Sequence, residues 1–330
     1  MKVLVTGAAG FVGSRLAEVL LDGGHAVCGF DLLDGEDPPG WQQARLEQAR
    51  GHERYTFVRG DVTDAASMDE VVVDFRPDAL VHLASRRDLG WAEEMPEACL
   101  RLHAEGTACV LQACLRKNIP QAVIGSSSHV YGGTRRFPFT EDDPADRPLS
   151  VIGAALRAAE LAAYAHALRS PVNVTVLRVF SVYGPRQSPV RLVPALAAAA
   201  ERRVPMPVFG DGTAGRDMIF VDDAVVGFLR ALDRPAPWRV LNLGTGQTTT
   251  LDQVAELVAW LSDVELQRER LPLRPGEMPH TFARIDAARD GIGFTPAVGL
   301  EEGIRRTLDW HRERGRAFCD IRGGGSRRST

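Results

Sequence analysis

The hydrophobic positions of the chain fall into short β-branched or apolar runs that alternate with segments of helical apolar spacing. The runs that predict strands are Lys2–Thr6, Ala26–Phe30, Tyr55–Val58, Ala79–Leu83, Ala122–Ile124 and Val174–Val179. The segments that predict helices are Ser14–Leu21, Ser67–Phe75, Thr107–Arg116 and Gly153–Leu168. Strands that alternate with helices are typical of an α/β fold with a doubly wound parallel sheet, which binds its ligand at the carboxyl ends of the strands.

From about residue 180 this rhythm loosens and prolines become frequent, which predicts a second, smaller lobe. Two later segments, Asp217–Leu232 and Val240–Gly244, are expected to return to the sheet. We therefore predict a nucleotide-binding domain over residues 1–179 plus about 217–244, and a substrate-binding lobe over about 180–216 and 245–314. Residues 315–330 have no apolar pattern and are predicted to form a disordered tail.

Charge and composition argue against several classes of function. The net charge of −4 gives no reason to expect a nucleic-acid partner. The chain starts without a basic-then-apolar leader, and no apolar run approaches the ~20 residues of a membrane span, so we expect a cytoplasmic protein. The five cysteines lack CxxC spacing and the histidines are scattered, which predicts neither a disulfide framework nor a metal site.

The turn after the first predicted strand is rich in glycine and reads Gly7-Ala8-Ala9-Gly10-Phe11-Val12-Gly13. Glycines there let the backbone turn tightly and approach a pyrophosphate, which the N-terminus of the next helix stabilises. The GxxGxxG spacing is weak alone, but here it joins a strand to a helix. The second predicted strand leads to Asp31, whose carboxylate would accept hydrogen bonds from an adenosine ribose and repel a 2′-phosphate. This pattern predicts NAD as the cofactor.

Further motifs follow in order: Gly60-Asp61-Val62, His82-Leu83-Ala84-Ser85, Ser126–Gly132 (SSSHVYG), Leu177–Pro185 (LRVFSVYGP), Arg216–Asp223 and Asn242–Gly246. With the glycine loop, they make the chain resemble the extended short-chain dehydrogenase/reductase family, in its NAD-dependent nucleotide-sugar epimerase/dehydratase branch. The resemblance runs from residue 2 to about residue 312. It implies a Rossmann-type fold, a nucleotide-sugar or related small-molecule substrate, and a homodimer built through helices 103–116 and 153–168.

The resemblance also implies which residues bind the cofactor. They are the loop residues Gly7, Gly10, Phe11, Val12 and Gly13, together with Asp31, Leu32, Asp61, Val62, Leu83, Ala84 and Ser85. For the substrate it implies Ser128, Phe180, Ser181, Arg216 and Arg274. The two arginines match family positions that bind the nucleotide diphosphate, and a guanidinium suits phosphate oxygens.

The chain departs from the family at the positions that carry its chemistry. The family uses a Tyr-x-x-x-Lys pair, in which the lysine lowers the pKa of a tyrosine that takes a hydroxyl proton. Here the tyrosine position is Ile152 and the lysine position is Leu156. The chain holds only two lysines, Lys2 and Lys117, and neither lies four residues after a tyrosine. A family asparagine that supports proton transfer is His103 here, so the chain is an atypical member.

Two residues remain as candidates for the catalytic group. Ser127 matches the family serine that hydrogen-bonds a substrate oxygen. His129 follows it, and an imidazole with a pKa near 6.5 suits proton transfer at neutral pH. The alternative is that His129 only packs at the strand end.

Three interpretations follow. The first is an NAD-dependent epimerase or dehydratase of a nucleotide sugar with relocated acid/base residues. The second is a non-redox isomerase or lyase that retains NAD structurally, and the third is a catalytically silent binding protein. We favour an enzyme, because the residues matched to substrate binding are kept.

Overall fold

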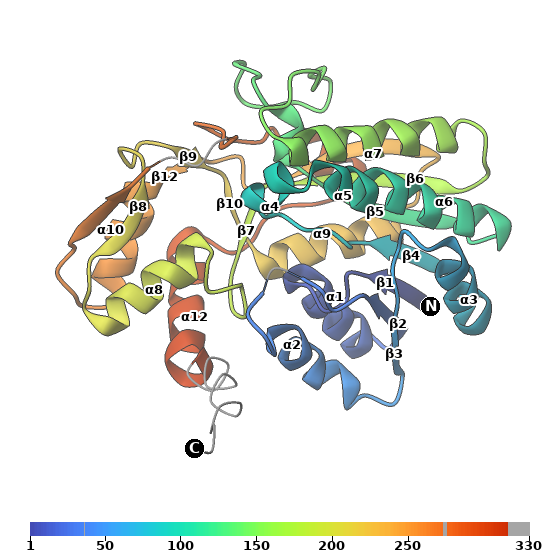
Figure 1. Ribbon diagram of the computed structural model, residues 1–330, viewed down its shortest axis with the longest axis horizontal. Helices are drawn as coiled ribbons and strands as arrows, with labels where there is room; N and C mark the ends of the chain where they lie inside the picture. The colour runs from blue at the N-terminus through green and yellow to red at the C-terminus, as the bar shows by residue number, and fades with distance from the viewer. Residues whose placement is uncertain (36, 273–275, 316–330) are drawn as a thin grey trace.

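The core of the protein is one parallel β-sheet of seven strands (Figure 1). The computed structural model describes residues 1–35, 37–272 and 276–315. The strand order is β11-β6-β5-β4-β1-β2-β3 and every neighbouring pair is parallel. The bounds are β1 Lys2–Thr6, β2 Ala26–Asp31, β3 Tyr55–Arg59, β4 Ala79–His82, β5 Gln121–Ser127, β6 Asn173–Val179 and β11 Trp238–Leu243. The predicted Rossmann-type fold is confirmed.

Helices cover both faces of this sheet (Figure 1). On one face lie α1 (Phe11–Asp22), α2 (Trp41–Arg50), α9 (Val221–Asp233) and α11 (Asp286–Ile292). On the other lie α3 (Ala65–Phe75), α6 (Gly106–Arg116) and α7 (Val151–Ala167). Each face has its own cluster of buried aliphatic side chains, and their removal from water is the main force that holds the layers together.

A second group of elements packs at the carboxyl-end side of the sheet, on the left of Figure 1. Its helices are α8 (Leu192–Arg202), α10 (Leu251–Leu261) and α12 (Leu300–Trp310), the last continued by a π-helical turn over His311–Gly315. Its short strands pair in twos and are β7 Ser181–Tyr183, β8 Met206–Phe209, β9 Gly215–Arg216, β10 Met218–Phe220, β12 Thr249–Thr250 and β13 Arg268–Leu271. This group has its own apolar core.

Several boundaries differ from the sequence prediction. Helix α1 begins at Phe11, directly after its N-cap Gly10, so Phe11 and Val12 belong to its first turn. Helix α2 was not predicted, because its sequence WQQARLEQAR is mostly polar and one of its buried residues is Arg45. The segment before α6 is also helical: α4 (Leu89–Glu94), α5 (Pro96–Leu100) and a π-helical turn over Arg101–Glu105. From residue 316 on, the predicted tail lies outside the described residues.

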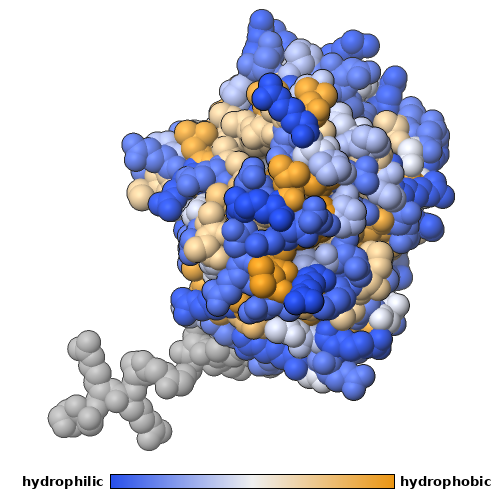
Figure 2. Space-filling model, turned by 90° about the vertical axis from the view of Figure 1, so that its right-hand side faces the viewer, coloured by the Kyte–Doolittle hydropathy of each residue, from blue (hydrophilic) through white to orange (hydrophobic). Residues whose placement is uncertain are grey.

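The surface carries apolar side chains in small groups. On the face that Figure 2 shows, these hydrophobic groups are separated by hydrophilic side chains, as is normal for a protein surface. Within the described part of the chain, no helix combines the length and the apolar character that crossing a bilayer requires.

A buried charged network joins α7 to the two strands beneath it. The Glu160 carboxylate accepts two hydrogen bonds from Arg178 of β6, at 3.0 and 2.8 Å, and a third from Ser126 of β5 at 2.6 Å. Glu160 and Arg178 are each only 2% exposed. Burial alone opposes the charged guanidinium, but its contacts with Glu160 raise the pKa of Arg178. The network fixes the carboxyl end of β5, where Ser127 follows Ser126.

We predict that Glu160→Gln lowers the free energy of unfolding by about 3–5 kcal/mol, because the change leaves the buried Arg178 charge without its counterion. Urea denaturation at neutral pH measures this loss. The matched control is Glu301→Gln, which removes an exposed i,i+4 pair with Arg305 on α12 and should change stability by less than about 1 kcal/mol. Equal losses in the two variants would contradict the assigned role of the buried pair.

Candidate active site

A cavity of about 750 Å³ lies at the carboxyl ends of the strands, between the sheet and the second group of elements. The glycine loop and the residues after β2, β3, β4 and β5 line it from the sheet side. Residues after β7, the start of α8 and Arg216 line it from the other side. This is the edge where a doubly wound sheet binds ligands.

Close backbone packing shapes the glycine loop. Gly7 has a φ of +70°, and a Cβ atom there would lie 2.5 Å from the backbone of Leu83 and Ala84. A Cβ atom on Gly13 would collide with the carbonyl oxygen of Gly7. Side chains are thus excluded between β1, α1 and the β4 loop, which leaves the backbone N–H groups at the start of α1 facing the cavity.

Asp31 ends β2 and ties the glycine loop to the next loop. Its two carboxylate oxygens accept hydrogen bonds from the N–H groups of Ala9 and Leu33, each at 2.9 Å. Burial raises the pKa of Asp31, although both hydrogen bonds oppose that rise. Asp31 also lines the cavity, so it is placed both to hold the loop and to meet a ribose.

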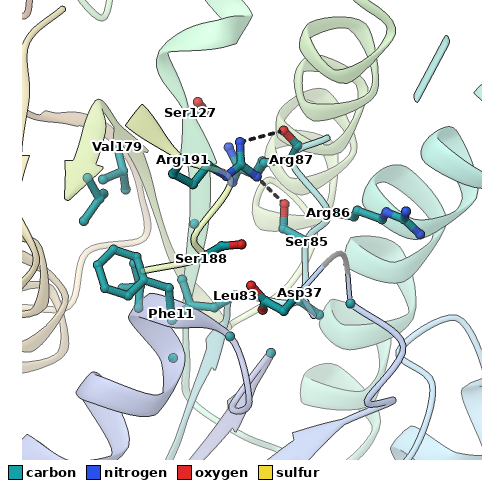
Figure 3. Close-up of a pocket in the computed structure, with 18 of the residues that line it drawn as sticks. Phe11, Asp37, Leu83, Ser85, Arg86, Arg87, Ser127, Val179, Ser188 and Arg191 are labelled. Carbon is teal, nitrogen blue, oxygen red and sulfur yellow. Dashed lines mark hydrogen bonds between the residues drawn. The ribbon is translucent and has the colours of Figure 1, made fainter. Parts of the chain in front are cut away.

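The segment 184–191 forms part of the cavity wall. Arg186 binds Glu18 of α1 with two contacts of 2.5 and 2.8 Å, and its carbonyl oxygen accepts from Arg45 at 3.0 Å. Next to this anchor, Ser188 is only 4% exposed. Gln187 and Ser188 line the cavity, and among the described residues the Ser188 Oγ and the Gln187 Oε1 are buried without a hydrogen-bond partner. Figure 3 shows Ser188. Buried polar atoms are normally paired, so these two atoms indicate a polar ligand.

The cavity therefore fits a dinucleotide. The glycine loop leaves room that a Cβ atom would fill, and Asp31 lines the cavity where the ribose of a dinucleotide would lie. The two buried polar atoms of Gln187 and Ser188 belong to the wall across from the glycine loop. NAD would be held by the glycine loop, Asp31 and the residues after β3 and β4.

The positions of the family's tyrosine and lysine lie in a closed apolar core. Ile152 and Leu156 are 0% and 3% exposed and pack with Tyr131, Phe139 and other apolar side chains. Neither belongs to the described residues that line the cavity. Tyr183 does line it, but its hydroxyl donates to the carbonyl of Leu300 at 3.3 Å. The two positions of the Tyr-x-x-x-Lys pair are thus occupied by apolar side chains of the core.

Ser127 and His129 form a hydrogen-bonded pair inside the cavity. The Ser127 Oγ lies 3.0 Å from the His129 Nδ1, and the turn after β5 brings both side chains to one side. Burial, reinforced by the positive charges of three arginines, lowers the pKa of His129 to about 3. The imidazole is therefore neutral in the free protein and can accept a proton through Ser127.

Those arginines are Arg87, Arg216 and Arg191, which we call the arginine triad. Arg216 contacts Glu277 at 3.3 Å, and burial lowers its own pKa. Arg87 donates from Nε to the Ser85 Oγ at 2.5 Å, and its carbonyl oxygen accepts from Arg191 at 3.4 Å (Figure 3). This concentration of positive charge suits an anionic ligand such as a diphosphate.

The structure brings most of the predicted site residues together. All twelve residues predicted for cofactor binding line the cavity, as do Ser127, His129, Phe180, Ser181 and Arg216. Ser128 is buried and is not among the described lining residues. Arg274 lies outside the described residues. His103 sits behind the cavity in the π-helical turn, with Nε2 3.3 Å from the carbonyl oxygen of Arg86, and burial lowers its pKa to about 3.

Sequence reasoning missed Arg87, Arg191, Glu277, Gln187 and Ser188, which also line the cavity. The available signal was weak. Arg86-Arg87 directly follows the HLAS motif after β4, and both residues line the cavity, but their side chains point in different directions (Figure 3). Arg86 stacks over Trp91, with its guanidinium 4.6 Å from the ring centre.

Known proteins share both the sequence and the fold of this chain. The model of the NAD dependent epimerase/dehydratase family matches residues 3–244. UDP-glucuronate 4-epimerase from Thermodesulfobacterium geofontis is 30% identical over 311 residues, covering 94% of this chain and 96% of that protein. dTDP-glucose 4,6-dehydratase from Streptomyces griseus is 31% identical over 314 residues, covering 94% and 93%.

A solved structure agrees with these relatives. The crystal structure of UDP-glucuronic acid 4-epimerase from Bacillus cereus, in complex with UDP-glucuronic acid and NAD, superposes with a TM-score of 0.88 at 27% identity. The match covers 95% of this chain and 99% of that one. The glycine loop, the sheet order and the matched motifs thus have one explanation: the chain belongs to the NAD-dependent epimerase/dehydratase family.

Proposed function

We propose that the protein catalyses NAD-dependent epimerisation or dehydration of a nucleotide-linked sugar, with Ser127 and His129 as its acid/base pair. The observation that carries the proposal is the 3.0 Å contact between Ser127 Oγ and His129 Nδ1, inside the cavity that also holds the glycine loop and Arg216. The named relatives that act on UDP-glucuronate and dTDP-glucose support a nucleotide-sugar substrate.

The two side chains divide the proton transfer between them. Ser127 Oγ takes a proton from a substrate hydroxyl while its own proton passes to His129 Nδ1, in the tautomer that carries hydrogen on Nε2. The reverse transfer returns the proton. When bound, NAD supplies the reversible acceptance of a hydride from a sugar carbon.

Burial is the main cause of the low basicity of His129, and the arginine triad lowers it further. In the free protein its positive charges help to keep the pKa of His129 near 3, which makes the imidazole a weak base. A bound diphosphate brings negative charge beside the triad, so the pKa of His129 rises toward the range where general base catalysis is efficient. Substrate binding and activation of the base are therefore coupled.

The direct test supplies NAD and a panel of UDP-, dTDP- and GDP-sugars, and follows product formation together with NADH absorbance. Turnover with a transient NADH signal is the expected result. Turnover without that signal would favour a non-redox isomerase or lyase that retains NAD structurally. Cofactor binding with no product from any sugar would favour a catalytically silent binding protein.

We predict that His129→Ala lowers kcat about 10²–10⁴-fold, because it removes the proton acceptor of Ser127. Steady-state kinetics on the accepted sugar measures the effect. His52→Ala is the matched control, since His52 follows α2 and is not among the described lining residues. Unchanged activity of His129→Ala would exclude His129 as the acid/base group.

The low pKa of His129 predicts the pH profile of kcat/KM, which reports the free enzyme. Because the folded pKa lies near 3, the imidazole stays neutral as the pH falls from about 7.5 to about 5.5, and kcat/KM should keep its value. The profile of His129→Ala, recorded over the same range, separates other titrating groups. An acidic limb centred near pH 6.5 in the wild type alone would contradict the assignment.

The organisation of the protein is proposed on the same basis. We keep the division into a domain over residues 1–179 plus about 217–244 and a lobe over about 180–216 and 245–314, and a cytoplasmic location. A homodimer through helices 103–116 and 153–168 is supported by exposed apolar side chains on one of them. Leu161 of α7 is 52% exposed, and Leu168, the C-cap of that helix, is 66% exposed.

If this dimer forms, Leu161→Glu places two like charges across a symmetric interface and should shift the protein to a monomer. Sedimentation velocity measures the change. Trp260→Glu is the control, since Trp260 is 65% exposed on α10, in the second group of elements. A wild type that sediments as a monomer at micromolar concentration would contradict the dimer.

A further inference from the structure

Arg87 occupies a distinct place within the arginine triad. It lies in the loop between β4 and α4, whereas Arg191 precedes α8 and donates to the Arg87 carbonyl oxygen at 3.4 Å, and Arg216 ends β9. Its Nε is fixed by the Ser85 Oγ at 2.5 Å, and the side chain is half-buried. Ser85 thus orients the guanidinium from behind, within its own loop.

The surroundings of Arg87 place it beside the reacting end of the cavity. Of the triad, Arg87 contributes most to lowering the pKa of His129. Its charge also acts to lower the pKa of His103 and of Cys99, two residues on helical segments that pack against α7. Figure 3 shows Arg87, Ser85 and Ser127 around one space, with Phe11 and Val179 toward its other side. Arg216 is paired with Glu277.

We propose that Arg87 binds a carboxylate on the reacting sugar, so that the preferred substrate is a nucleotide-linked uronic acid and not a neutral hexose. The proposal rests on the proposed function, because it assigns the sugar of that same site. A guanidinium is planar and binds a carboxylate with two parallel hydrogen bonds, which a neutral hydroxymethyl group cannot match. Arg216, which ends β9 in the second group of elements, is placed to meet the diphosphate.

The same guanidinium chemistry also recognises a phosphate, so the experiment separates the two anions. Isothermal titration with UDP, UDP-glucose and UDP-glucuronate is carried out on protein loaded with NADH, which fills the cofactor site and cannot accept a hydride. Wild-type protein should bind UDP-glucuronate about tenfold or more tightly than UDP-glucose. Arg87→Gln should abolish this preference and leave the affinities for UDP and UDP-glucose unchanged.

Two further variants keep the test interpretable. Arg87→Lys retains the charge but not the planar fork, so it should keep part of the preference even if Arg87→Gln folds poorly. Arg86→Gln is the matched control: Arg86 also lines the cavity, but its guanidinium lies over the Trp91 ring and points away from Arg87 and Ser127 (Figure 3). It should leave the ratio of the two sugar affinities at its wild-type value.

Each remaining outcome decides a different point. Equal affinity for the two sugars in the wild type would overturn the carboxylate site and leave the proposed function intact. A parallel loss of UDP, UDP-glucose and UDP-glucuronate binding in Arg87→Gln would assign Arg87 to the diphosphate and overturn the proposal. Absence of binding by any nucleotide or nucleotide sugar, in protein shown to be folded and NADH-loaded, would overturn the proposal together with the proposed function.

Discussion

The buried carboxylate of Glu160 is the point on which the site depends. It collects hydrogen bonds from Arg178 on β6, from Ser126 on β5 and from Arg157 on its own helix. An ion pair this deep is costly to desolvate, and it is tolerated because every oxygen lone pair has a donor. The contribution of the ion pair is to position α7: through Ser126 it holds the helix against the end of β5, one residue before Ser127.

That placement also explains where the chemistry has to be. One side of α7 presents Glu160 to the strands, and its N-terminal turns bury Ile152 and Leu156 in a core with Tyr131 and Phe139. Phe139 stacks on Tyr131 with ring centres 4.6 Å apart, which leaves the core close-packed around these positions. Because that helix is occupied by packing, the acid/base groups that we propose lie in the turn after β5.

The fold and the cofactor half of the site were predictable because they depend on local pattern. Strand β1 has the predicted limits, and a glycine loop between a strand and a helix has a single physical explanation. Helix α2 was not predicted, because its buried side includes Arg45, a charged residue that hydrogen-bonds Asp37 and distant carbonyl oxygens. The substrate half of the site was not fully predicted for a related reason. Arg87 and Arg191 are in contact although more than a hundred residues separate them in the sequence, and the sequence around neither residue indicates that contact.

Ser128 illustrates a finer limit. The sequence SSSH offers three serines before the histidine, and the family resemblance assigned two of them, Ser127 and Ser128, to the site. Strand β5 ends at Ser127, and the 3-10 turn that follows directs Ser127 and His129 into the cavity while Ser128 turns into the protein. The geometry of the turn after β5 decides the matter, and it becomes visible only when the end of the strand is known.

The edge strand β11 has a consequence for how the chain folds. It pairs with β6 along its whole length, from Trp238 with Val174 to Leu243 with Val179, after the chain has passed through β7, α8 and α9. The sheet therefore cannot be completed until residue 243 has been synthesised. Until then the edge of β6 has no partner strand. Parallel pairing across such a long intervening segment is slow and leaves a strand edge open to wrong partners. A fragment ending near residue 179, although it holds the whole glycine loop, would carry that edge permanently.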